Sequence, residues 1–169
     1  MDNLLTFDKL MQAVAMRESS QNPNAVSSGG AVGLLGIMPG DAMAGMRNNV
    51  PTVFEAAEQL GFQPATRDKQ AAISLLKDPA INSMIGEAYM KELLNKYGGD
   101  TEAVLTSYNA GPGKFDRVGS AAGMDIEEQR EYAKMVSEDY KNMFGSHLPN
   151  NLGVLYSPRP QPRPVGLLD

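Results

Sequence analysis

The feature that most constrains this fold is helical hydrophobic periodicity interrupted by glycine and proline. No stretch of more than a few residues alternates between apolar and polar side chains as a half-buried strand does. The pattern predicts helices at 7–18, 41–46, 53–61, 67–76, 80–97, 101–111 and 125–144. We expect at most a small β-ribbon near residues 26–35. The chain is therefore predicted to be mainly α-helical.

Local signals at the helix ends support this interpretation. Thr52 with Glu55, and Asp125 with Glu128, have the spacing of a capping box, in which two side chains satisfy free backbone N–H groups. Gly98-Gly99 predicts the end of the helix over 80–97, because glycine readily adopts the left-handed conformation of a C-terminal cap.

Glu18 is the first candidate functional residue. It continues a stripe of Phe7, Leu10, Met11 and Val14 that recurs at helical spacing, so an acid lies at the end of an apolar face. Burial against apolar neighbours disfavours the charged form of a carboxyl and raises its pKa, as a proton donor near neutral pH requires. Periodicity alone also allows a helix-terminal glutamate that faces water.

A series of short motifs resembles the soluble-type (SLT) lytic transglycosylases, in order and spacing, from about Leu10 to Tyr140. The matching positions are Glu18-Ser19, Asn22-Pro23, Ser27, Gly30-Ala31, Gly33-Leu34 and Ile37-Met38-Pro39-Gly40, then Leu76-Lys77-Asp78-Pro79, Asn82, Gly86, Tyr89 and Tyr97-Gly98-Gly99-Asp100, then Ser107-Tyr108-Asn109-Ala110-Gly111, and finally Glu128-Gln129-Arg130-Glu131-Tyr132.

The resemblance implies a lysozyme-like (goose-type/SLT) helical domain that cleaves peptidoglycan. Glu18 would protonate the β-1,4 bond between N-acetylmuramic acid and N-acetylglucosamine, and a 1,6-anhydro product would form without metal or organic cofactor. Ser27 would hydrogen-bond the substrate, Met38, Tyr108 and Asn109 would line the cleft, and Tyr132 would orient Glu18. Read without the resemblance, Tyr108 is instead a core ring and Asn109 a helix cap.

This chain departs from the family pattern at three positions. Leu35-Gly36 stands where the family usually has Met-Gln, so an amide that would hydrogen-bond sugar is missing. Gln129 replaces the usual threonine. Glu128, in the same motif, is interpreted as a helix cap or ion-pair partner rather than a second catalytic acid.

Composition narrows the alternatives. The 169 residues suffice for one domain with a core, and the net charge of −5 argues against nucleic acid as the main ligand. Without cysteine, thiolate metal sites and disulfides are excluded, and the single His147 cannot form a histidine cluster. No apolar run reaches the length of a transmembrane segment, and residues 1–5 lack the pattern of a secretory signal.

We expect a lysozyme-like domain over 1–148 and a proline-rich tail over 149–169. Proline alternates with polar residues from Pro158 to Pro164, which favours an extended polyproline conformation. The tail is either disordered or docks on a partner such as a virion tail or internal protein. With no predicted signal, a wall enzyme carried in a phage virion is the favoured interpretation. A hydrolytic muramidase on the same fold and a non-catalytic virion structural protein are the alternatives.

Overall fold

Helices account for most of residues 2–152, which the computed structural model describes; for residues 2–5 this holds for the backbone alone. The elements are α1 (Asp2–Ser19), α2 (Pro39–Ala44), α3 (Val53–Gln59), α4 (Lys69–Leu76), α5 (Pro79–Lys96), α6 (Thr101–Ala110), α7 (Pro112–Val118), the 3-10 helix η1 (Ala121–Gly123) and α8 (Glu127–Phe144). The prediction of a mainly α-helical chain is confirmed.

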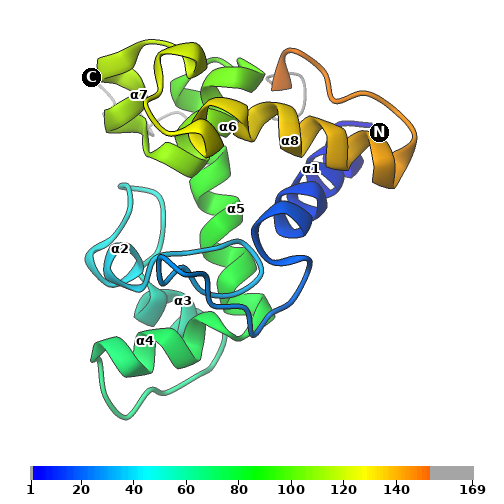
Figure 1. Ribbon diagram of the computed structural model, residues 1–169. Helices are drawn as coiled ribbons and strands as arrows, with labels where there is room; N and C mark the ends of the chain where they lie inside the picture. Colours follow the sequence, from blue (N-terminus) through cyan, green and yellow to red (C-terminus); the bar gives the residue numbers. More distant parts are fainter. Residues whose placement is uncertain (1, 153–169) are drawn as a thin grey trace, which may run out of the picture.

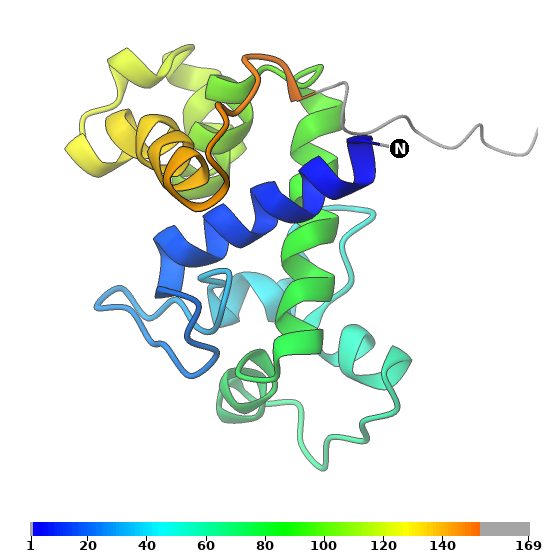
Figure 2. The same ribbon diagram turned by 90° about the vertical axis from the view of Figure 1, so that its right-hand side faces the viewer.

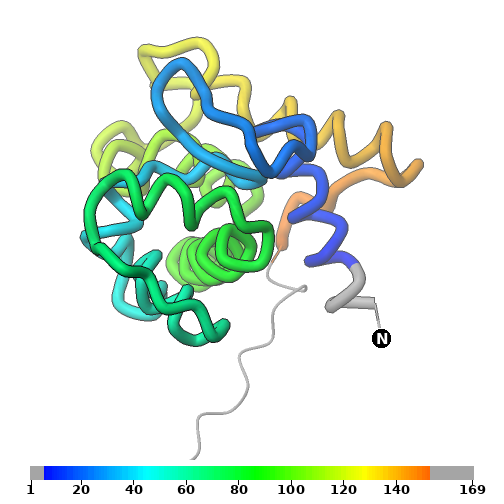
Figure 3. The backbone as a smooth tube through the Cα atoms, turned by 90° about the horizontal axis from the view of Figure 1, so that it is seen from below, coloured from blue at the N-terminus to red at the C-terminus, as the bar shows by residue number. Residues whose placement is uncertain are grey.

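Helix α5 is the central element around which the other helices pack. In Figure 1 it runs between α2, α3 and α4 at one end and α6, α7 and α8 at the other, and Figure 3 looks almost along its axis. Because neighbours cover it on several sides, apolar residues are buried around much of its circumference. Its buried residues are Ile81, Asn82, Ile85, Gly86, Tyr89, Met90, Leu93 and Leu94.

Helix α1 packs against α8 and crosses in front of α5 in the view of Figure 2. The predicted apolar stripe is confirmed, since Phe7, Leu10, Met11 and Val14 all belong to the buried core. The ammonium of Lys91 from α5 lies over the ring of Phe7, 5.3 Å from its centroid. The end of α1, where Glu18 lies, is therefore held by packing along the helix.

The loop between α1 and α2 contains two isolated antiparallel bridges, Val26 with Val32 and Val32 with Ile37. No regular strand forms in residues 2–152, so the expected ribbon is reduced to these bridges. Fully buried Asn82 of α5 fastens the loop. Its Nδ2 donates to the carbonyl oxygens of Val32 (3.0 Å) and Leu76 (2.8 Å), and its Oδ1 accepts from the N–H of Leu35 (2.9 Å).

Two of the predicted helix-end signals are confirmed. The Thr52 hydroxyl accepts from the N–H of Glu55, and the Glu55 carboxylate accepts from the N–H of Thr52, each at 3.2 Å. After α5, Gly98 and Gly99 have φ angles of 59° and 81°, the left-handed region that glycine favours.

The capping box predicted for Asp125 and Glu128 is wrong. Ile126 precedes α8 and makes no side-chain cap, while the Asp125 carboxylate is bound by the ammonium of Lys114 at 2.6 Å. Helix α7 was not predicted. Pro112 ends α6 as expected, but it also starts α7, since proline is well suited to the first turn of a helix.

Residues 149–152 pack against the helical domain. The Thr101 hydroxyl donates to the carbonyl of Pro149 at 2.6 Å, and the N–H of buried Leu152 donates to the carbonyl of Gly99 at 2.6 Å. The rest of the predicted tail, 153–169, including the proline-rich segment, lies outside the described residues. The division at residue 148 therefore stays a prediction.

Within the described part of the chain, each helix is too short or too polar to cross a membrane.

Asn82→Ala is expected to destabilise the fold by about 3 kcal/mol, because it leaves the buried N–H of Leu35 and the buried carbonyl of Leu76 without the Asn82 amide as partner. The Val32 carbonyl keeps its hydrogen bond from the N–H of Ile37. Urea unfolding of the two proteins measures the difference. Asn95→Ala, on the exposed face of the same helix, is the control and should change stability by less than about 0.5 kcal/mol. Equal losses in the two variants would contradict the anchoring role of Asn82.

Candidate active site

Glu18 lies in the last turn of α1, with its side chain largely covered by neighbouring elements. The helix ends at Ser19, and Ser20 and Gln21 follow with φ angles of 52° and 60°. This left-handed turn sends the chain away from the helix axis and into the loop that returns toward Glu18. The alternative of a glutamate that simply faces water does not hold.

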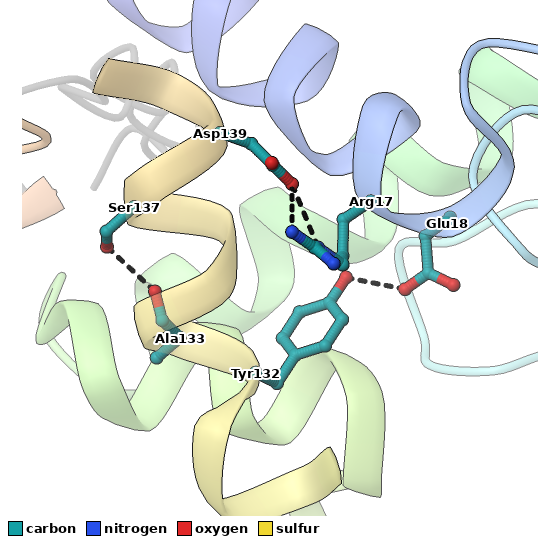
Figure 4. Close-up of polar contacts among 6 residues, drawn as sticks. All are labelled: Arg17, Glu18, Tyr132, Ala133, Ser137 and Asp139. Atoms are coloured by element: carbon teal, nitrogen blue, oxygen red, sulfur yellow. Dashed lines mark hydrogen bonds and ion pairs between the residues drawn. The ribbon is translucent and has the colours of Figure 1, made fainter. Parts of the chain in front are cut away.

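Tyr132 of α8 makes the direct contact to the acid. Its hydroxyl donates to Oε1 of Glu18 at 2.5 Å, and the tyrosine itself is only 1% exposed (Figure 4). A buried ring has little freedom to move, so the phenol holds Oε1 in one place. The neutral acid then carries its proton on the other oxygen, Oε2, which Figure 4 shows pointing away from Tyr132.

Gly36 of the loop lies close to the other oxygen of the carboxyl. It has a φ of +62°, and a Cβ built on it would lie 2.4 Å from Oε2 of Glu18. Any other residue here would have a strained backbone, and its Cβ would displace the Glu18 carboxyl. At the position where the family usually has glutamine, this chain therefore has a glycine whose backbone lies close to Glu18.

The surroundings raise the pKa of Glu18 from 4.5 to about 7. Burial is the main cause, because it removes water from the charged form, and the negative charge of Glu128 adds to it. The Tyr132 hydrogen bond and the positive charge of Arg17 act in the opposite direction. A carboxyl with this pKa exchanges its proton near neutral pH, as a general acid that must later act as a base requires.

Tyr108 and Asn109, at the end of α6, lie near the acid in different ways. The Tyr108 hydroxyl donates to the carbonyl of Leu35 at 2.9 Å, so the ring supports the loop next to Gly36. Burial raises the pKa of Tyr108 well above its usual value, with the Glu18 charge adding to the effect. The Asn109 amide reaches Oε1 of Glu128 at 3.5 Å rather than capping its helix.

Ser27 and Met38 are exposed residues of the loop. The Ser27 hydroxyl oxygen accepts from the N–H of Ala31 at 3.0 Å and so closes the turn. Met38 precedes α2 and is 41% exposed, which leaves its side chain open to a ligand. The structure thus gathers Glu18, Tyr108 and Tyr132, and the roles of Ser27 and Met38 toward a substrate stay predictions.

Sequence reasoning missed how Ser19 and Asn82 position the site. The Ser19 hydroxyl lies within donating distance of the carbonyl oxygens of Ala15 (3.0 Å) and Leu34 (2.9 Å), and its single proton joins the end of α1 to the loop that carries Gly36 when it is donated to Leu34. Both residues belong to the quoted motifs, but the motifs alone give them no role. The available signal for Asn82 was a polar residue beside the apolar Ile81 in the helix predicted over 80–97.

Comparisons with known proteins now identify the family. The family model of the "Transglycosylase SLT domain" matches residues 7–130. This chain belongs to the SLT transglycosylase family. It is 34% identical over 121 residues to the membrane-bound lytic murein transglycosylase C of Yersinia enterocolitica, covering 68% of this chain and 30% of that protein. It is 28% identical over 136 residues to the soluble lytic murein transglycosylase of Escherichia coli K12, covering 73% of this chain and 18% of that protein.

Solved structures of other SLT proteins share the fold. The 70 kDa soluble lytic transglycosylase of Escherichia coli superposes with a TM-score of 0.58 and 25% identity, over 88% of this chain and 23% of that one. The lytic transglycosylase Slt of Pseudomonas aeruginosa gives a TM-score of 0.59 and 22% identity, over 85% of this chain and 23% of that chain. The fold is therefore the predicted lysozyme-like one, and this SLT chain spans less than a third of the length of the relatives it matches.

Within residues 2–152, no group of three or more carboxylate or histidine side chains is arranged to hold a metal ion.

Glu18→Gln is expected to stabilise the protein above pH 7 and to have little effect below pH 4.5. Because the folded pKa of Glu18 lies above its unfolded value, the contribution of Glu18 to stability is fully present below about pH 4.5 and is lost as the pH rises to about 7. Glutamine removes this loss, which for a pKa raised from 4.5 to about 7 we expect to be about 3 kcal/mol. Urea unfolding at several pH values checks it, with Glu138→Gln on the exposed face of α8 as control. Parallel pH curves for wild type and Glu18→Gln would contradict the prediction.

Proposed function

We propose that this domain is a peptidoglycan lytic transglycosylase with Glu18 as its single catalytic acid and base. The observation that carries the proposal is a partly buried carboxyl whose pKa is about 7 and whose Oε1 is held by the Tyr132 hydroxyl. Membership of the SLT family and relatives named as lytic murein transglycosylases support it.

The proposed reaction has two proton transfers through one carboxyl group. Oε2 of Glu18 gives its proton to the oxygen between N-acetylmuramic acid and N-acetylglucosamine, and the bond from that oxygen to C1 of the muramoyl residue breaks. The C6 hydroxyl of the same residue then attacks C1 and returns its proton to Glu18. The products are a 1,6-anhydromuramoyl end and a free N-acetylglucosamine hydroxyl.

An internal nucleophile explains why one carboxyl suffices. Most glycosidases use a second carboxylate, which attacks the sugar or activates a water molecule. Glu128 is the other acid beside Glu18, but it is exposed and accepts a hydrogen bond from Asn109. A C6 hydroxyl already tethered to the reacting ring removes much of the entropic cost of bringing in a nucleophile.

The remaining candidate residues are assigned to substrate binding as part of this proposal. Met38 and Asn109 would contact the glycan strand from the two sides of Glu18, and Ser27 would hydrogen-bond an N-acetyl group. Tyr108 would act through the Leu35 carbonyl, by holding the loop next to the reacting bond. Tyr132 would fix the orientation of the acid.

Glu18→Gln is expected to leave the fold intact and to lower peptidoglycan cleavage by at least about 100-fold, the usual contribution of a general acid–base. Loss of turbidity of purified peptidoglycan measures the rate, and circular dichroism checks the fold. Glu138→Gln, the exposed control, should retain wild-type activity. An active Glu18→Gln variant would overturn the assignment of the acid.

Mass spectrometry of the released fragments separates this proposal from its alternatives. Lytic transglycosylation leaves 1,6-anhydromuramoyl ends, which are one water lighter than the reducing ends produced by hydrolysis. Reducing ends that depend on Glu18 would instead show a hydrolytic muramidase. A folded wild-type protein that releases no fragments would favour a non-catalytic structural role.

For the biological setting, we propose that the domain opens the cell wall locally during phage entry, as a component of the virion. A domain of this size followed by the proline-rich segment 158–164, with Arg159 and Arg163, has the composition of a catalytic module that docks on a partner. The protein should then be found in purified phage particles by proteomics. Its absence from the particles, together with its presence in the lysate, would overturn this setting and leave the chemistry untouched.

A further inference from the structure

An ion pair lies next to Glu18 in the chain and two helical turns from Tyr132. Arg17 of α1 binds Asp139 of α8: its Nε and one terminal nitrogen lie 2.9 and 2.8 Å from the same oxygen, Oδ2. The two side chains are 34% and 17% exposed, so the pair is partly shielded from water. None of the SLT motifs found in the sequence contains Asp139.

The geometry makes this pair a second connection between the two helices that form the site. Tyr132 and Asp139 are seven residues apart on α8 and therefore face the same side, while Glu18 and Arg17 are adjacent on α1. Figure 4 shows the Arg17 and Glu18 side chains leaving the end of α1 in different directions, one toward Asp139 and the other toward Tyr132. The Arg17–Asp139 ion pair and the Tyr132–Glu18 hydrogen bond thus both join the end of α1 to α8.

The charges facing Glu18 come from two helices, α1 and α8. On α8, Glu128 raises the pKa of Glu18 and the Tyr132 hydrogen bond lowers it; on α1, Arg17 lowers it. Tyr108 of α6 faces the acid as a neutral phenol. Arg17 is thus the cation among these groups, and its position is set by Asp139.

We propose that Arg17 and Asp139 are a positioning pair for Glu18, which holds the end of α1 on α8 and directs the neighbouring cation away from the carboxyl. The inference deepens the proposed function, since it concerns the residue assigned there as the acid. Neither residue needs to touch the substrate. Their contribution is to keep Tyr132 on Oε1 and to limit how strongly a positive charge favours the ionised acid.

The proposal predicts pKa changes of opposite sign for the two single variants. In Asp139→Asn the cation loses its counter-charge, so the pKa of Glu18 should fall by about half a unit. In Arg17→Gln the cation is gone while Asp139 stays charged, so the pKa of Glu18 should rise by about half a unit. The double variant should lie between the two single variants.

The test is an NMR titration of the Glu18 side-chain carboxyl in the full chain, labelled with ¹³C-glutamate and assigned by the signal that Glu18→Gln lacks. Arg67→Gln and Glu58→Gln, which break a well-exposed ion pair near α3, make the same changes in net charge and serve as controls. They should leave the Glu18 titration unchanged. The pH of half-maximal peptidoglycan cleavage on the alkaline side should move with the titration.

Two results would overturn the positioning role. The first is a pKa of Glu18 that stays the same in both single variants; the second is a shift in the same direction in both, as expected if the variants merely loosen the packing. The titration does not depend on enzymatic activity. If the protein cleaves no peptidoglycan but the pKa values move apart, the proposed function fails and the positioning inference stands.

Discussion

The site depends on keeping one carboxyl group out of water without giving it a cation as a direct partner. Burial of a lone carboxyl costs free energy unless it is neutral or hydrogen-bonded. Glu18 meets this requirement through a neutral donor, the Tyr132 hydroxyl, and through backbone packed against it at Gly36. A neutral donor holds the acid in place and lowers its pKa less than burial raises it, so the proton can leave and return near neutral pH.

The rest of the fold can be understood as the support for this arrangement. Helix α5 contributes Asn82, whose amide fastens the loop, while the hydroxyls of Ser19 and Tyr108 bind the carbonyl oxygens of Leu34 and Leu35. The loop therefore has little freedom to withdraw from the acid. Helix α8 completes the site from the opposite direction with Tyr132. Residues far apart in the sequence thus meet at one side chain.

The helices and the acid could be predicted because their signals are local. The stripe from Phe7 to Glu18 follows from periodicity, and the capping box of Thr52 and Glu55 uses neighbouring residues. The prediction for Asp125 failed because its carboxylate is bound by Lys114 from α7, a helix that the sequence pattern did not show. Likewise, the close approach of Gly36 to Glu18 depends on a loop path set by distant contacts. Tyr132 was identified from the family motifs, and the structure shows its hydrogen bond to Glu18.

The most direct test of this account is the pKa of the Glu18 carboxyl in the wild-type protein, read from its ¹³C chemical shift as the pH is raised. The account predicts a midpoint near pH 7, with the side chain largely protonated at pH 6. A midpoint at the ordinary value of 4.5 would mean that water reaches the carboxyl freely. That result would contradict the claim that burial prepares this acid for catalysis.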